Sequence, residues 1–527
     1  MDCGRDTHEC NTAESIDLND MPYARAGYEQ EKGCLPGTRV SLLQEICDVL
    51  NDPAEDAPRV CLLTGVAGSG KSAVAHSIAQ IYDEQKRLAS SYCFASSEVK
   101  NRNPQNLFST IARDLCNHDP QYKYTLWRVV KDDRALRTST SPLKQLERFI
   151  VEPSRKLDSI GPQLVVIIDA LDESGDEADR QELLKAISKQ IASNALPTNL
   201  RFLLTARPES DILANLPSGP HLIHKQIGDI SADIVDRDIE RLIHHSLDEY
   251  PELESSLPNQ EWCRLLVRRS EHLFRWAATA CKFICAKGAN PCDQLNLLLQ
   301  SEGSTSVYPL DELFQTILDQ LFPSPDTRQS FHDVMAVILA LHEPLSLASL
   351  SALFYSTEDL NVQYIINRMG SLLYGVFDQD MPIHPLHTSF HNFLLDETRS
   401  STFHVRILPY HYLPLGRALL DCMRDKLRFN ICDLRDSRLR NAEVPDLDER
   451  VKMAISPHLS YSCRYWMDHL QCVDCTPELL KEIACFFKDL FPYWVEAISL
   501  LSYISSVHPI LSAQEACTIL STWAKVC

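Results

Sequence analysis

The chain has 527 residues, enough for three or four domains, and its 44% hydrophobic and 23% charged residues are typical of globular proteins. Its formal net charge of −21 argues against nonspecific nucleic-acid binding, which requires Lys and Arg to neutralise phosphates. No apolar run approaches a membrane span, and the first ten residues are charged where a signal peptide would be apolar. The 19 cysteines are scattered, as free thiols in a reducing compartment would be. Composition therefore predicts a cytoplasmic protein with no nucleic-acid and no membrane partner.

The first part of the chain leads into a helix. Residues 1–32 are polar and show no sustained period, which predicts a disordered or linker segment. A turn at residues 33–39 precedes residues 40–50, whose apolar side chains recur at helical spacing. A helix is therefore expected before the first strand.

The clearest motif lies in residues 59–79. An apolar run at residues 60–63 predicts a buried strand, and the residues from Gly65 to Ser72 fit G-x-x-x-x-G-K-[ST] at every position. The glycines let backbone N–H groups curl around an anion, the next helix offers the positive end of its dipole, and Lys71 reaches the terminal phosphates. Ser72 is expected to hold Mg²⁺. The predicted nucleotide-binding residues here are Gly65, Val66, Ala67, Gly68, Ser69, Gly70, Lys71, Ser72 and Ala73.

A dinucleotide site is the alternative interpretation of this stretch. Gly68, Gly70 and Ala73 also satisfy the looser pattern G-x-G-x-x-[GA]. That pattern has no need of the adjacent Lys71–Ser72 pair and leaves an aspartate-ended strand downstream unexplained. The phosphate-loop interpretation is therefore favoured.

Strands and helices alternate after the loop, which predicts a parallel sheet with helices on both faces. The expected elements are a helix at residues 72–87, a strand at 90–95, and helices at 104–116 and 142–157.

The next apolar strand, residues 164–168, delivers carboxylates at its end. In open parallel sheets, ligands bind beyond the carboxyl ends of the strands, so Asp169 is expected beside the Mg²⁺ of the phosphate loop. Glu173 is expected to orient or deprotonate the attacking water, with Asp172 as the alternative candidate. The simpler alternative is an acidic turn that only caps a helix.

A further buried strand at residues 201–205 brings Arg207 to the same edge. A guanidinium there could sense or stabilise the γ-phosphate. The alternative is a local ion pair with Glu209 or Asp211. A last edge strand is expected at residues 221–224.

The pattern becomes helical from residue 231 onward. Helices are expected at residues 233–247, 261–286, 310–322, 329–341, 346–354 and 362–369, followed by strands at 372–376 and 383–386. Helices followed by a hairpin predict a winged helix, and its candidate recognition segment has one arginine and two acids, which argues against DNA binding.

The remaining residues look helical and irregular, without repeats. Ligand types suited to zinc occur at Cys463, His469, Cys472 and Cys475, but chance is favoured in a chain this rich in cysteine.

Four of these stretches, GCLPGTR, GVAGSGKS, LVVIIDALDES and LLTARPE, resemble the NACHT group of STAND P-loop NTPases, in its fungal nephrocystin-3-like N-terminal form. Residues 386–394 look like the winged-helix segment in which a histidine contacts the β-phosphate of the nucleotide, and His387 holds that position. The resemblance implies that His387 locks an ADP-bound closed state. A histidine that only caps a helix is the alternative.

The resulting fold prediction is a P-loop NTPase α/β domain followed by an all-α domain, a winged helix and a C-terminal helical region. The predicted ranges are a linker segment at 1–32, the NACHT domain at 33–228, a small helical domain at 229–305, the winged helix at 306–400 and the C-terminal helical domain at 401–527.

The resemblance implies a signalling switch controlled by ADP and ATP with Mg²⁺. Slow NTP hydrolysis would reset it, activation would assemble a homo-oligomer, and the output through an unknown effector protein would be incompatibility or innate-defence signalling. Two alternatives stay open. One is an ordinary P-loop ATPase with rapid turnover, and the other is a nucleotide-locked scaffold that does not hydrolyse.

Overall fold

The protein is described from a computed structural model, in which the chain forms two compact units, residues 1–313 and 314–527. The structure describes residues 18, 21–54, 56–94, 102–131, 133–155, 163–253, 261–300, 309–354, 361–436, 438–473 and 476–503. In this described part, no helix is both long and apolar enough to cross a membrane. The boundary between the two units falls inside the range predicted for the winged helix, and the five predicted domain ranges stay predictions.

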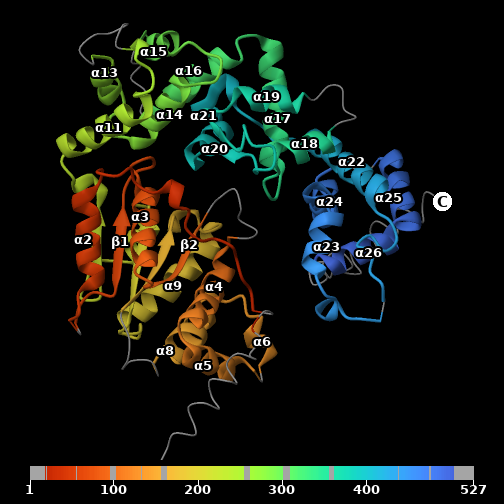
Figure 1. Ribbon diagram of the computed structural model, residues 1–527, viewed down its shortest axis with the longest axis horizontal. Helices are drawn as coiled ribbons and strands as arrows, with labels where there is room; N and C mark the ends of the chain where they lie inside the picture. The colour runs from red at the N-terminus through yellow and green to blue at the C-terminus, as the bar shows by residue number, and fades with distance from the viewer. Residues whose placement is uncertain are drawn as a thin grey trace, which may run out of the picture. The chain divides into compact units, whose positions relative to one another are not determined.

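The first unit is built on a parallel sheet with strand order β2-β3-β4-β1-β5 (Figure 1). Its strands are β1 (Val60–Thr64), β2 (Leu88–Cys93), β3 (Leu164–Asp169), β4 (Leu200–Ala206) and β5 (Leu222–Gln226). In the register, Thr64 pairs with Ala206 and Ile168 pairs with Leu204. The carboxyl ends of β1, β4 and β3 therefore lie next to one another, with β4 in the middle.

Strands β1, β3 and β4 are buried almost throughout, as expected for the inner strands of a parallel sheet covered on both faces. Val60 and Leu62 join one core, whereas Cys61 and Leu63 join the other. Side chains of α2 (Val40–Asn51) and α3 (Lys71–Glu84) complete the second core. The first core is completed by α4 (Pro104–His118), α5 (Pro120–Val130), the π-helical segment η3 (Leu146–Val151) and α9 (Glu177–Ala192). The remaining helices of this layer are α6 (Arg134–Arg137), α7 (Pro142–Gln145), α8 (Glu152–Ser154) and α10 (Ser210–Asn215).

The segment at residues 21–32 packs on the sheet, so the predicted linker does not hold for this part of residues 1–32. Ala24 and Ala26 are buried in the first core. The Cys93 N–H donates to the Ala26 carbonyl (2.7 Å), and the Tyr28 N–H donates to Ser91 Oγ (2.8 Å). This strap is extended against the edge strand β2 and ends in the short 3-10 helix η1 (Gln30–Lys32). It has no sustained helical or strand period, which is why the sequence pattern missed it. Residues 1–17 lie outside the described part.

The described helices that follow β5 in the first unit are α11 (Ala232–Leu247), α13 (Glu261–Arg269), α14 (Phe274–Ile284) and α15 (Pro291–Gln300). One continuous helix was predicted over residues 261–286, but the structure breaks it after Arg269. Glu271 and His272 take left-handed conformations with φ of 46° and 65°. A non-glycine residue in that region is uncommon, and no glycine or proline announces the break.

The second unit is almost entirely helical. Its elements include α16 (Pro309–Leu321), which crosses the boundary, α17 (Pro325–Ala340), α18 (Leu347–Leu353), α19 (Val362–Arg368), β6 (Leu373–Tyr374), β7 (His384–Pro385), α20 (Thr388–Leu395), α21 (Glu397–Ser400), α22 (Pro409–Lys426), α23 (Leu447–Ala454), α24 (Pro457–Leu470), α25 (Pro477–Asp489) and α26 (Phe491–Leu500). Strands β6 and β7 pair antiparallel, as the predicted hairpin requires. The winged-helix assignment itself stays a prediction.

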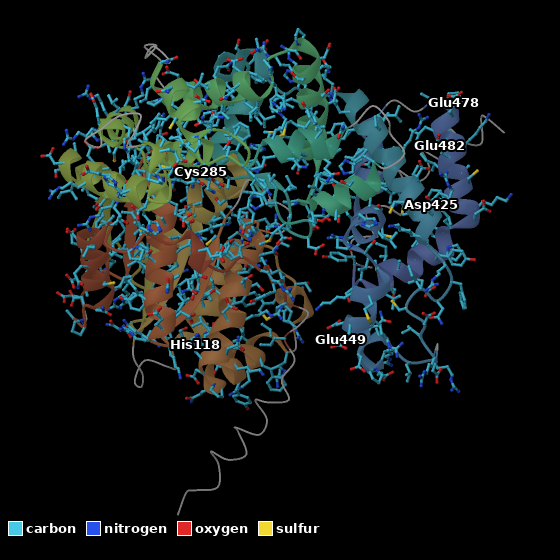
Figure 2. All side chains as sticks on the ribbon, turned by 45° about the horizontal axis from the view of Figure 1, so that its top comes forward. His118, Cys285, Asp425, Glu449, Glu478 and Glu482 are labelled. Carbon is cyan, nitrogen blue, oxygen red and sulfur yellow. The ribbon has the colours of Figure 1, made fainter. Side chains whose placement is uncertain are left out.

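Helix α25 shows how this unit separates apolar from charged surface. Leu479, Ile483 and Phe486 are buried on one face. Glu478 and Glu482, labelled in Figure 2, lie beside this buried face, and Glu482 Oε2 is 3.3 Å from Arg417 Nε on α22. This spacing is that of an amphipathic helix.

Candidate nucleotide site

The phosphate loop joins β1 to α3 through backbone that favours glycine. Gly68 and Gly70 have φ of +81° and +96°, which L side chains rarely adopt. A Cβ on Gly68 would lie 2.9 Å from the Cβ of Arg275, and one on Gly65 would lie 2.7 Å from Ser69 Oγ. The glycines of the motif are therefore required by conformation and by close approach.

The side chains of the loop suit an anionic ligand. The Lys71 ammonium donates to the carbonyls of Gly65 (2.7 Å) and Val66 (3.1 Å). Among the described residues, the buried hydroxyl of Ser69 finds no hydrogen-bond partner. Ser72 is exposed in the first turn of α3. A phosphate group would satisfy the Ser69 hydroxyl and would replace the loop carbonyls as the acceptor for Lys71, so the residues present fit a nucleotide.

The charged groups at the ends of the neighbouring strands affect the pKa of Lys71. Burial lowers its pKa, and the Asp172 carboxylate opposes that shift. Asp169 and Glu173 act in the same direction as Asp172, whereas Arg207 acts with burial. The structure thus brings together the lysine, the acids and the arginine that the sequence placed at one edge.

The carboxylate of Asp169 is fixed by the strand between it and the loop. Asp169 ends β3 and is only 3% exposed. Thr205 on β4 donates through Oγ1 to Asp169 Oδ1 at 2.5 Å, and the Ala170 N–H donates to the same hydroxyl at 3.0 Å. Thr205 leaves the second carboxylate oxygen of Asp169 for other partners. No motif in the sequence marks Thr205 for this role.

Arg207 pairs with the acids that follow β3. The backbone N–H of Arg207 donates to Asp172 Oδ1 (3.0 Å), and the guanidinium Nε lies 3.0 Å from Asp172 Oδ2. Its Nη2 lies 4.0 Å from Glu173 Oε1.

The local ion pair considered for Arg207 was wrong. Glu209 and Asp211 instead pair with Arg180, at 3.3 Å and 2.8 Å. Sequence proximity suggested the wrong partner because the strand register carries Arg207 towards Asp172.

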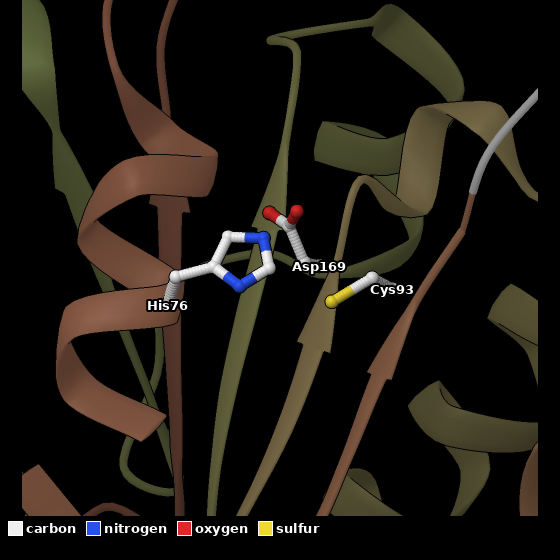
Figure 3. Close-up of side chains that lie close together, drawn as sticks. All are labelled: His76, Cys93 and Asp169. Carbon is white, nitrogen blue, oxygen red and sulfur yellow. The ribbon is translucent and has the colours of Figure 1, made fainter. Parts of the chain in front are cut away.

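His76 and Cys93 also lie against Asp169, and the sequence analysis did not single them out. Figure 3 shows the His76 ring beside the Asp169 carboxylate and the Cys93 thiol, and one ligand atom of each lies within 4.8 Å of the others. The Glu29 N–H donates to His76 Nδ1 (2.9 Å). Because a backbone N–H can only donate, the neutral ring carries its proton on the other nitrogen, Nε2.

This tautomer argues against a metal at His76. A metal-bound histidine normally uses its second nitrogen as a donor, and here that nitrogen accepts a hydrogen bond. The ring therefore fits a role in positioning Asp169 better than a role as a ligand. The only signal in the sequence was a histidine five residues after Lys71, within the buried face of a helix.

Arg39 connects the loop to the helical part of the first unit. It is 4% exposed, its Nη2 donates to the Ser69 carbonyl (3.0 Å), and its guanidinium lies 4.6 Å from the Phe274 ring centroid. Its backbone N–H donates to Asp238 Oδ2 on α11 (2.9 Å). Burial lowers the pKa of Arg39, with Asp238 opposing the shift.

Arg275 makes a second link, because its N–H donates to the Gly68 carbonyl at 3.1 Å. Burial lowers its pKa to about 10. Helices α11 and α14 are thus both tied to the phosphate loop.

His387 belongs to the second unit and begins α20. Its Nδ1 accepts a hydrogen bond from the Ser389 N–H (2.9 Å), so the side chain caps the helix. Its contact with the nucleotide stays a prediction.

The zinc pattern has one member, Cys475, outside the described residues. Of the others, His469 is buried and its Nε2 bonds to the Tyr461 hydroxyl at 2.8 Å.

A family model matches part of the first unit. Residues 37–207 match the family model described as "Nephrocystin 3, N-terminal". A search of curated proteins finds no match. Among solved structures, the chain is similar to the STAND protein with a tetratricopeptide repeat sensor from Pyrococcus horikoshii, at 14% identity and a TM-score of 0.38. That alignment covers 97% of this chain and 66% of that one.

A second similar structure is Drosophila ORC bound to poly(dA/dT) DNA and Cdc6, at 14% identity and a TM-score of 0.23. The alignment covers 88% of this chain and 72% of that one. The family match runs from the turn before α2 through the phosphate loop and the acidic strand to Arg207. Residues 37–207, about a third of the chain, are thus similar to the nephrocystin 3 N-terminal family, and this stretch contains the phosphate loop of a P-loop fold.

Proposed function

We propose that this protein is a signalling switch controlled by ADP and ATP, with slow hydrolysis that resets it. The observation that carries the proposal is the ion pair of Arg207 with the acids at the end of β3, on the same edge as Lys71. A guanidinium already engaged with those acids can change partners when a γ-phosphate arrives.

The roles follow from the positions of the side chains. Residues Gly65 to Ala73 would bind the phosphates, and Ser72 and Asp169 would hold Mg²⁺. When bound, Mg²⁺ neutralises charge on the β- and γ-phosphates. Thr205 keeps Asp169 in one orientation through its 2.5 Å hydrogen bond.

Slow hydrolysis is expected because the candidate base is restrained. Glu173 lies 4.0 Å from Arg207, so its carboxylate is partly neutralised before any water is activated. If Arg207 moves to the γ-phosphate, Glu173 is released to orient or deprotonate the attacking water. Asp172 would remain the alternative base. An ordinary ATPase with rapid turnover has no need of this restraint.

The signalling output is the wider part of the proposal. The ATP form would expose surfaces for assembly into a homo-oligomer and would act in the cytoplasm on an effector protein, in incompatibility or innate-defence signalling. His387 would hold the ADP form closed through the β-phosphate.

The test is to purify the full chain, release its nucleotide by denaturation, and measure turnover of added ATP. We expect close to one ADP per chain and turnover below about 1 per second, the lower end for typical enzymes. An empty site with rapid turnover would favour the ordinary ATPase, and bound ATP without turnover would favour the non-hydrolysing scaffold.

A further inference from the structure

Three metal-binding side chains meet on the helical side of the first unit, apart from the nucleotide residues. Glu240 and His244 on α11 and Cys263 on α13 each offer one ligand atom, and these atoms lie within 4.8 Å of one another. The nucleotide chemistry uses none of the three.

The backbone explains why they meet. Glu240 and His244 are four residues apart on one helix, so they share a face, and α13 packs on that helix. Cys263 is fully buried, and the His244 ring lies edge-on against Trp262, with centroids 5.7 Å apart. The thiol is therefore fixed, and the indole limits the orientation of the imidazole.

The cluster opens on a cavity that provides access. This groove of about 990 Å³ is lined by residues of the turn before α2, including Pro36 and Val40, and by α11, including Glu240 and His244. A cation could enter from the groove, and a water molecule or a ligand could complete its coordination there.

We propose that Glu240, His244 and Cys263 form a binding site for a divalent transition metal, with Zn²⁺ as the best fit. Zinc accepts sulfur, nitrogen and oxygen ligands in tetrahedral geometry, and sites with three protein ligands keep the fourth position open. Tetrahedral ligand atoms at zinc distances are about 3.3–3.7 Å apart, so small side-chain rotations would close the present spacing.

The charges of the site suit a dication. A thiolate and a carboxylate together carry two negative charges, which the metal would balance. The metal binds the deprotonated thiol, so binding would release a proton from Cys263.

The test uses the full chain, stripped with a chelator, and Co²⁺ as a spectroscopic probe for the zinc site. We expect one Co²⁺ per chain with a thiolate-to-metal charge-transfer band, and displacement of that band by Zn²⁺. Cys263→Ser should abolish the band, and Glu240→Gln and His244→Ala should each weaken binding by at least about tenfold.

Three controls separate this site from other thiols and from the nucleotide site. Cys285→Ser changes a cysteine at the end of α14, labelled in Figure 2. Cys93→Ser changes the thiol beside Asp169, and Ser72→Ala changes the hydroxyl predicted to hold Mg²⁺. All three should keep the band, and far-ultraviolet circular dichroism verifies the fold of every variant.

The proposal is overturned if the folded parent shows no band, if the band survives in Cys263→Ser, or if it disappears in Cys93→Ser or Cys285→Ser. Unchanged affinity in both Glu240→Gln and His244→Ala would also overturn it. Glu240 is only half-buried and Gln has nearly the same size, so Glu240→Gln keeps the test valid if another variant misfolds.

Discussion

The edge of the sheet in the first unit and the core of the second unit are held together by different chemistry. At the edge, Arg207 Nε lies 3.0 Å from Asp172 Oδ2, and the charges of both residues act on the pKa of Lys71. In the second unit, Trp466 and Trp494 lie edge to face with ring centroids 6.4 Å apart, and Trp494 Nε1 donates to the Cys463 carbonyl (2.8 Å).

This difference explains which features of each region can be predicted from the amino-acid sequence. A phosphate group has fixed geometry and charge, so the residues that bind it occupy fixed sequence positions. An aromatic core can be filled in many ways at similar volume, so it leaves only an apolar period in the sequence. We therefore expect substitutions at the edge to change ligand binding, and substitutions in the aromatic core to change stability.

The largest expected effect is that of Lys71→Ala. If the ammonium exchanges its two loop carbonyls for phosphate oxygens, the variant loses two charged hydrogen bonds worth about 1.5–3 kcal/mol each, so ADP should bind roughly 10²- to 10⁴-fold more weakly. Isothermal titration of nucleotide-free protein measures this. Thermal stability of the nucleotide-free protein should be unchanged, and a large loss of stability would mean that the edge is structural rather than dedicated to a ligand.

Next comes Trp494→Ala, which should destabilise the second unit by about 3–5 kcal/mol because it leaves a cavity. Amides of α24 and α26 should then exchange hydrogen faster, whereas those of the sheet should not. Trp494→Phe is the matched control, since it keeps most of the ring and loses only the hydrogen bond to Cys463. If Trp494→Ala binds ADP more weakly while the amides of the sheet keep their protection from hydrogen exchange, the core of the second unit affects ligand binding as well as stability. That result would contradict the expectation stated above for the two regions.

His387 lies in the second unit, but it is predicted to bind the β-phosphate of the nucleotide. If its imidazole also binds the β-phosphate, His387→Ala should speed ADP release about 10- to 150-fold, for a hydrogen bond to a charged group worth about 1.5–3 kcal/mol. Fluorescent ADP release measures this. His387→Asn retains a helix cap. If Asn restores the slow release of the parent, the role of His387 is capping alone.

The smallest expected effect is a pH dependence of the second unit. Burial, followed by the charge of Lys426, lowers the pKa of His458 from 6.5 to about 4. The unfolded chain then binds a proton below about pH 6.5 that the folded chain excludes, so stability falls as the pH drops from 7 towards 4. Denaturant titrations at several pH values give the free energy of unfolding across this range. The free energy should fall less steeply with decreasing pH in His458→Gln than in the parent. An equal decrease in both proteins would mean that groups other than His458 cause the pH dependence of stability.

The sequence predicted much of the nucleotide edge and less of its surroundings. Asp169 and Arg207 were placed at the correct edge because an apolar run ending in a charged residue marks the end of a buried parallel strand. Thr205 and His76 were missed because a hydroxyl or imidazole that positions a carboxylate needs no motif. The partner of Arg207 was missed because strand order, not sequence distance, decides which acid it meets.

The helical parts show the same limit. The break after Arg269 depends on left-handed residues that the apolar pattern does not reveal. The strap at residues 21–32 depends on alanines that fit against β2. Residues 1–17 and Cys475 lie outside the described part, so those predictions stay predictions.

The central claim is that the nucleotide controls assembly. Glu173→Gln should bind ATP and hydrolyse it slowly, which allows the ATP form to be held for measurement. Its mass in solution should be determined by light scattering with ADP and then with ATP and Mg²⁺, with Lys71→Ala as the control that responds to neither. We expect a monomer with ADP and a larger assembly with ATP, and the same mass with both nucleotides would contradict the switch.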